Sequence, residues 1–235
     1  LGDLFTMANY RKAFGNLNIL GGYRNSIFIS TIVAAIVVVL AGLASFALVR
    51  YSFKLKGTLQ SLVMAAMMFP VFATIIPVFN MEFKWGIANT GSWGLTMLSV
   101  ILPQIAGNLS FAIVVLTGFI KGLPLELEEA AYMEGCNAFQ IFFKVVVPLT
   151  KPSFATVAIF SFLWSYNDLF TQSFFLRTKE MWGITVLLNQ LTSQEGTNYG
   201  LMAAAVTLVV VPVLIVYIFL QKYIIKGMTA GAIKG

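Results

Sequence analysis

The sequence predicts an all-α membrane protein. Of its 235 residues, 59% are hydrophobic and only 10% are charged, whereas soluble domains carry roughly 25% charged residues. Several uncharged stretches are longer than the roughly 20 helical residues that cross a bilayer core of about 30 Å. The single cysteine excludes an internal disulfide, and the absence of histidine removes histidine-based catalytic triads and the commonest zinc ligand.

Three spans are predicted in the first half of the chain. Residues 25–49 and 57–81 carry no charge, and the uncharged region after Lys84 is long enough for an interfacial loop followed by a span at 98–120. Pro70 interrupts the second span, as does Pro77, and such prolines are tolerated where neighbouring groups or water satisfy the freed carbonyls. Small side chains in the first span favour close helix packing: Ala41, Gly42, Ala44 and Ser45.

Two more spans are predicted in the second half, at residues 152–176 and 201–221, separated by a polar loop at 177–200. The fourth span contains Asp168. A charged side chain within a span costs roughly 3 kcal/mol or more. We therefore expect either a water-filled cavity or a polar partner beside Asp168.

The distribution of basic residues predicts the orientation. If the loop after the third span is cytoplasmic, nine basic residues lie inside and six outside, in agreement with the positive-inside rule. Because the number of predicted spans is odd, the C-terminus then lies inside and the N-terminus outside. The basic residues are scattered and do not form the single patch expected of a nucleic-acid-binding protein.

Residues 123–152, LPLELEEAAYMEGCNAFQIFFKVVVPLTKP, predict two short helices separated by a bend. Pro124 suits the first position of a helix, and Gly135 suits a left-handed stop. Asn137 followed by Gln140 is typical of a capped second helix. The acidic residues of the first helix fall in its first turns, where the helix dipole favours negative charge: Glu126, Glu128 and Glu129.

The segment Glu129-Ala130-Ala131, followed by Gly135 and Pro148, resembles the EAA loop of the membrane subunits of ABC importers. The wider string resembles the carbohydrate-permease branch, the maltose-type family. The segment FSFLWSYNDLF is similar to the fifth-helix signature of sugar permeases. The C-terminal residues 226–235 also resemble the carbohydrate-permease branch. Two positions depart from the family pattern: Glu134 stands where aspartate is usual, and Cys136 where alanine is usual.

This resemblance implies a type I ABC importer transmembrane subunit, of which five of the usual six spans are present here. The missing first span is inferred to precede Leu1. The expected organisation is an external segment at 1–24, a transmembrane domain at 25–225 with its cytoplasmic coupling loop at 121–151, and a cytoplasmic tail at 226–235. The implied location is the bacterial or archaeal cell (inner) membrane.

The implied function is ATP-driven uptake of a sugar or oligosaccharide. The expected partners are a second permease subunit forming a heterodimer, a cytoplasmic ABC ATPase dimer, and an external solute-binding protein. The chain lacks the phosphate-loop motif GxxxxGK[ST], so no cofactor is expected in it; ATP and Mg would bind to the ATPase. We expect a transport subunit and not an enzyme.

Two groups of site residues follow from the resemblance. The ATPase-coupling group is Glu128, Glu129, Ala130, Ala131, Gly135 and Pro148. The substrate-pathway group combines an aromatic face with amide and carboxylate partners, as sugar sites commonly do: Asn167, Asp168, Trp164 and Asn108. For Asp168 a structural role remains open as an alternative, and the same alternative is favoured for Asn108. Cys136 is interpreted as a small apolar filler at a bend, since it has no basic partner.

Other functions remain open at this point. The chain could be an importer permease for a non-sugar solute such as an amino acid, phosphate ester or polyamine. A membrane enzyme would need intramembrane acid or metal-ligand clusters, which the sequence does not contain. A purely structural membrane adaptor, in which residues 123–152 are only a polar cytoplasmic loop, is the third alternative.

Overall fold

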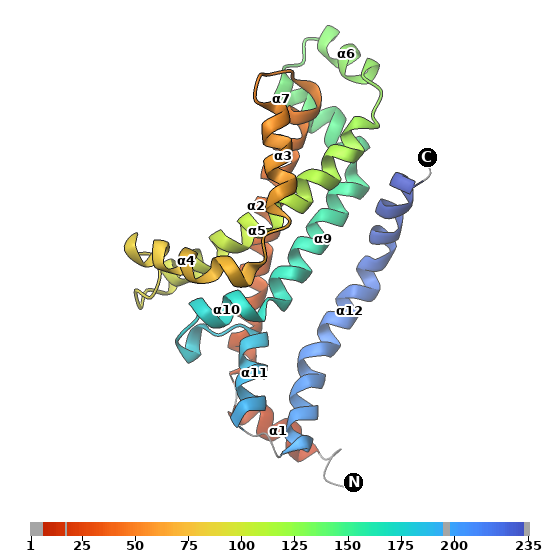
Figure 1. Ribbon diagram of the computed structural model, residues 1–235. Helices are drawn as coiled ribbons and strands as arrows, with labels where there is room; N and C mark the ends of the chain where they lie inside the picture. The colour runs from red at the N-terminus through yellow and green to blue at the C-terminus, as the bar shows by residue number, and fades with distance from the viewer. Residues whose placement is uncertain (1–6, 17, 195–197, 233–235) are drawn as a thin grey trace. The chain divides into compact units, whose positions relative to one another are not determined.

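The computed structural model describes residues 7–16, 18–194 and 198–232, and within them the secondary structure is helical. The chain divides into two compact units. Unit 1 comprises Leu1–Ile32, Thr74–Gln104 and Leu163–Leu220. Unit 2 comprises Val33–Ala73, Ile105–Phe162 and Gln221–Gly235. Figure 1 labels the helices along the chain.

Among the residues that the structure describes, α2 (Ile19–Arg50) and α5 (Trp93–Lys121) are each long and apolar enough to cross a membrane alone. Two further segments meet the same criterion of length and composition as bent pairs. One pair is α3 (Lys56–Ala66) with α4 (Val71–Lys84), and the other is Ala138–Leu149 with α9 (Lys151–Asn167).

The remaining elements are short apart from α12. They are α1 (Met7–Asn16), α6 (Glu126–Met133), α7 (Ala138–Ile141), a π-helical segment (Phe142–Val146), α8 (Val147–Leu149), α10 (Leu169–Phe175), a 3-10 turn (Lys179–Met181), α11 (Ile184–Gln194) and α12 (Tyr199–Ala232).

The helices differ from the predicted spans at their ends and at two internal breaks, one before α4 and one between α9 and α10. The second span is interrupted before Pro70, as its sequence predicts, while Pro77 stays inside α4. The third helix begins at Trp93, a residue of the predicted interfacial loop, because the left-handed Gly91 ends that loop just before it. The last helix extends to Ala232 and so includes most of the predicted tail; Leu1, Lys234 and Gly235 lie outside the described residues.

Unit 2 has an aromatic core around Phe142. The Phe142 ring centroid lies 5.5 Å from that of Phe46 on α2 and 6.2 Å from that of Phe154 on α9. A Cβ atom added at Gly42 would come within 2.7 Å of Phe154 Cε1. The small side chain predicted to permit close packing is therefore required at this position of α2.

In unit 1, polar side chains of α2 fix the start of α11. Asn25 Nδ2 donates to the carbonyl oxygens of Glu180 at 3.0 Å and Trp182 at 3.2 Å. Ser26 Oγ accepts a hydrogen bond from the backbone N–H of Ile184 at 2.9 Å. Both side chains are fully buried, so these bonds satisfy backbone groups that water does not reach.

Candidate functional site

The predicted loop at 121–151 lies in unit 2 and folds as two short helices with a bend. Gly135 has a φ of +81°, so the predicted left-handed stop is confirmed. The capping box is also confirmed: Asn137 Oδ1 accepts from the Gln140 N–H at 3.0 Å, and Gln140 Oε1 accepts from the Asn137 N–H at 2.9 Å. The helix starts later than predicted, because Leu125 is its N-cap and Pro124 precedes that residue.

The second half of the loop contains a π-helical segment just before Pro148. A proline ring clashes with the carbonyl four residues earlier and has no N–H to donate. The π-helical turn at Phe142–Val146 widens the backbone there, and the helix continues to Leu149. The helix therefore continues one residue past Pro148, and the axis turns by 84° between Ala138–Leu149 and α9.

An ion pair anchors the first helix of this loop. Arg50, the last residue of α2, donates from Nε to Glu128 Oε1 at 2.8 Å, and its Nη2 lies 2.6 Å from the same oxygen. The same Nη2 donates to the carbonyl oxygens of Ile120 at 3.1 Å and Leu123 at 3.2 Å, at the C-terminal end of α5. The Arg50 and Glu128 side chains are only 14% and 8% exposed, so Glu128 faces the protein.

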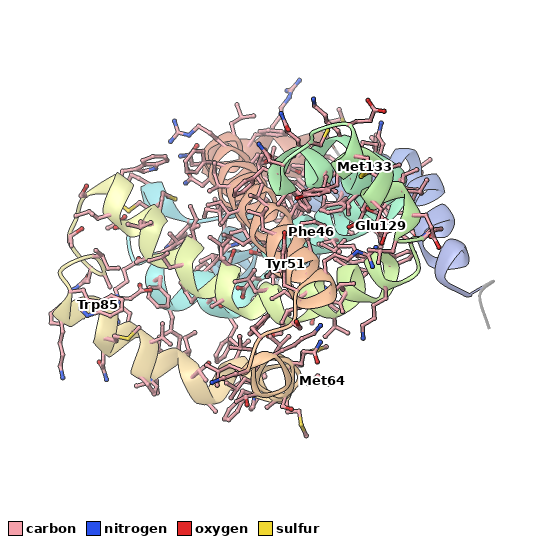
Figure 2. All side chains as sticks on the ribbon, turned by 90° about the horizontal axis from the view of Figure 1, so that it is seen from above. Phe46, Tyr51, Met64, Trp85, Glu129 and Met133 are labelled. Carbon is pink, nitrogen blue, oxygen red and sulfur yellow. The ribbon has the colours of Figure 1, made fainter. Side chains whose placement is uncertain are left out.

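The other residues of α6 leave an exposed surface. Glu129 and Ala130 are exposed, Ala131 is half-buried, and the neighbouring Tyr132 and Met133 are 70% and 84% exposed. A hollow of about 440 Å³ is lined by Glu128, Glu129, Tyr132 and Met133. Figure 2 shows the chain from above, with Glu129 and Met133 of α6 labelled. Exposed aromatic rings and methionine side chains are enriched at protein contact surfaces.

In unit 1, Asp168 lies at a break in the fourth predicted span. The span stops at Asn167, and Asp168 is the N-cap of α10: its Oδ1 accepts from the Thr171 N–H at 2.9 Å. Its Oδ2 accepts from Gln104 Nε2 of α5, also at 2.9 Å. The polar partner expected for this charge is therefore an amide together with a backbone N–H.

This network continues into the interior of unit 1. Ser165 Oγ donates to Gln104 Oε1 at 2.5 Å, and Gln172 Nε2 donates to the Ser165 carbonyl at 2.9 Å. Gln104, Ser165 and Gln172 are all buried. A Cβ added at Gly183 would lie 2.0 Å from Gln172 Oε1, so this glycine leaves the space that the amide occupies. The carboxylate is thus one end of a packed hydrogen-bond network.

The other predicted pathway residues are divided between the two units. Trp164 is 45% exposed and Asn167 is exposed, with its Nδ2 donating to the Leu163 carbonyl at 2.8 Å. These two residues and Asp168 belong to unit 1. Asn108 belongs to unit 2, where it is buried.

Sequence reasoning missed the roles of Arg50 and Gln104. Arg50 directly follows the uncharged run at 25–49, and this position is a signal of a helix-end contact. Gln104 lies within the predicted third span. No local pattern joins it to Asp168, 64 residues away.

Residues 38–230 match the family model described as "Binding-protein-dependent transport system inner membrane component". The chain is 32% identical over 213 residues to the arabinooligosaccharides transport system permease protein AraQ of Halalkalibacterium halodurans, covering 91% of this chain and 74% of that protein. It is 34% identical over 232 residues to the trehalose transport system permease protein SugB of Mycobacterium tuberculosis, covering 98% and 82%.

A third relative is the melibiose/raffinose/stachyose import permease protein MelC of Bacillus subtilis, with 29% identity over 228 residues, covering 97% of this chain and 80% of that protein. The family match spans most of the helices described above, including the whole loop at 121–151. The helical fold, the apolar helices and this match agree. The chain belongs to the family of inner membrane components of binding-protein-dependent transport systems.

Proposed function

We propose that this chain is a permease subunit of an ATP-driven importer that takes up a sugar or oligosaccharide delivered by an external solute-binding protein. The curated relatives named above are permeases whose names specify arabinooligosaccharides, trehalose, or melibiose, raffinose and stachyose. The shared chemistry of these solutes is a polyhydroxylated ring. This favours a carbohydrate over an amino acid, phosphate ester or polyamine.

The observation that carries this proposal is the construction of the loop at 121–151. Its first helix is held at its base through Glu128, while Glu129, Ala130 and the apolar side chains of Tyr132 and Met133 are exposed. Such a surface suits docking on a cytoplasmic ATPase. We assign the contact to Glu129, Ala130, Ala131 and Gly135, with Pro148 shaping the second helix of the loop and Glu128 serving as the anchor.

For the substrate pathway we propose Trp164 and Asn167, the two exposed members of the predicted group. An aromatic face with an amide beside it suits a sugar ring. The hydrogen bonds of Asp168 support the structural alternative for that residue, in which it holds the break between α9 and α10. Burial supports the same alternative for Asn108.

The working complex in this proposal contains a second, different permease subunit, two copies of the ATPase and the binding protein. ATP and Mg bind to the ATPase and not to this chain. The loop at 121–151 and the C-terminal residues 226–235 face the cytoplasm, and residues 1–24 lie outside. For ATP hydrolysis and substrate transport to be coupled, ATP and substrate must favour different conformations of the complex by a few kcal/mol.

The test is to purify the intact complex with its binding protein and screen sugars by thermal shift of that protein. ATP hydrolysis by the complex in lipid vesicles is then measured with and without the sugar-loaded binding protein. We expect hydrolysis to rise and the sugar to accumulate in the vesicles. Stimulation only by an amino-acid-loaded or polyamine-loaded binding protein would contradict the sugar assignment, and no stimulation by any loaded binding protein would contradict the transport assignment.

A further inference from the structure

Arg50 occupies the point in unit 2 where three helices meet. It ends α2, its guanidinium bonds two carbonyl oxygens at the end of α5, and it pairs with Glu128 on α6. We infer that Arg50 is a positioning residue for ATP-driven transport: it clamps the coupling helix α6 to the ends of α2 and α5. This inference rests on the proposed function of the loop.

The geometry uses what is specific to an arginine. A guanidinium presents several N–H donors in a planar fork, so one side chain can serve three acceptors on two elements. Nε donates to Glu128, while Nη2 lies against the same carboxylate oxygen and also donates to the carbonyls of Ile120 and Leu123. A lysine ammonium can replace the charge, but it cannot reproduce this planar arrangement of donors.

Arg50 adds side-chain hydrogen bonds to the turn that follows α5: Nη2 donates to the Ile120 carbonyl in the last turn of the helix and to the Leu123 carbonyl two residues beyond Lys121. The C-terminal end of the helix dipole also favours a positive charge there. The N–H groups of Gly122 and Leu123 turn back to Phe119 and Ile120 at 3.1 Å each, so the chain reverses tightly here. Arg50 therefore fixes the point from which the chain enters α6.

Because the ion pair is buried, it fixes the position of α6 relative to Arg50 more firmly than an exposed ion pair would. Glu128 is 7% exposed, whereas Glu126 and Glu129 of the same helix are exposed. A carboxylate out of water is stable only while its partner is in place. Rotation or withdrawal of α6 would separate Glu128 from Arg50, so a load applied to the exposed face of α6 is passed to the ends of α2 and α5.

Other contacts in unit 2 hold α2 and α5 together, so an experiment can distinguish the positioning role of Arg50 from a role in folding. Ser45 Oγ of α2 donates to the Ile113 carbonyl of α5 at 3.1 Å, and the aromatic core around Phe142 contacts α2 through Phe46. These contacts lie away from Arg50 and remain when it is replaced. Loss of the guanidinium should then release α6 without separating α2 from α5.

The test compares Arg50→Gln, Arg50→Lys and Glu128→Gln with Lys54→Gln, which removes an exposed positive charge four residues from Arg50. The intact complex in vesicles is assayed for sugar transported per ATP hydrolysed. Arg50→Gln should lower this ratio several-fold. Arg50→Lys and Glu128→Gln should lower it less, since each retains part of the contact, and Lys54→Gln should leave it unchanged.

A second readout uses Cys136, the chain's single cysteine, which is half-buried at the bend after α6. Its alkylation rate in the assembled complex, followed by mass spectrometry of this subunit, reports the placement of the loop. The rate should rise several-fold in Arg50→Gln and stay unchanged in Lys54→Gln. If Arg50→Gln does not assemble, Arg50→Lys carries the test with the same two readouts.

An unchanged transport ratio together with an unchanged alkylation rate in the Arg50 variants would overturn the clamp. So would an effect of the same size in Lys54→Gln, because a general loss of positive charge would then explain it. Failure of the proposed function is distinguishable, since in that case the unaltered complex would itself show no hydrolysis dependent on the loaded binding protein.

Discussion

The junction at Arg50 in unit 2 and the junction at Asp168 in unit 1 both hold a carboxylate near the end of a long helix. In unit 2 the carboxylate of Glu128 faces a guanidinium. In unit 1 the carboxylate of Asp168 faces the Gln104 amide and the Thr171 N–H. Removing Arg50 therefore leaves the largely buried charge of Glu128 unpaired, whereas removing Asp168 leaves only neutral donors unpaired.

The difference also concerns what each junction joins. Arg50 connects elements on which the exposed loop surface depends, whereas Asp168 closes a break within one span and fixes the start of α10. We interpret the first as a contact that transmits force and the second as a contact that shapes a helix end. Substitutions in the two junctions should accordingly differ in both size and kind of effect.

The largest effect is expected from Arg50→Met. This substitution leaves Glu128 without its countercharge, which costs on the order of 3 kcal/mol for a buried pair. The measurement is the denaturation midpoint of the detergent-purified complex, converted to a change in unfolding free energy. The double variant Arg50→Met with Glu128→Met should recover much of the loss, since it removes both charges; no recovery would argue against a paired junction.

Asp168→Ala should have the next largest effect, about 2 kcal/mol, because it removes an N-cap and a hydrogen bond to a buried amide. Asp168→Asn should retain most of the stability, since asparagine caps helices as well as aspartate does. Transport assays in vesicles distinguish a structural role of Asp168 from a role in the substrate pathway. A stable Asp168→Asn complex that no longer transports would restore Asp168 to the substrate pathway, and full stability and transport in Asp168→Ala would remove it from either role.

Gly135→Val should cost about 1–2 kcal/mol, since a φ of +81° is unfavourable for a β-branched residue. The resulting shift of the bend should uncouple ATP hydrolysis from transport, so that hydrolysis persists while sugar uptake falls. Gly118→Val is the matched control, because this glycine lies within α5 and nothing approaches within 4 Å of an added Cβ. Full transport in Gly135→Val would contradict the coupling assignment.

The smallest effect is expected from Asn137→Ala. It removes one of the two hydrogen bonds of the capping box, which costs about 1 kcal/mol. Asn137→Ser should be close to the unaltered protein, because serine is an equally good cap. Thermal denaturation of the complex measures the difference between the two variants; equal losses would show that the cap hydrogen bond does not stabilise α7.

Local features of the sequence predicted much of the loop. The glycine stop at Gly135 and the capping box at Asn137 depend on neighbouring residues only, and both are confirmed. Hydropathy predicts one continuous span through Asp168, but the structure breaks the helix there. The reason is that capping competes with helix continuation, and hydropathy does not record that competition. The start of α11 likewise depends on Asn25, a residue of a distant helix.

The sequence by itself determined that the chain is helical and apolar enough for a membrane, where the loop lies, and which family pattern it carries. These properties follow from composition, periodicity and motifs that act over a few residues. Only the tertiary structure decided that Glu128 faces inward while Glu129 is exposed, and that Arg50 and Gln104 are the partners of the two carboxylates. These pairings join residues 64 and 78 positions apart, so they arise only when separate helices pack together.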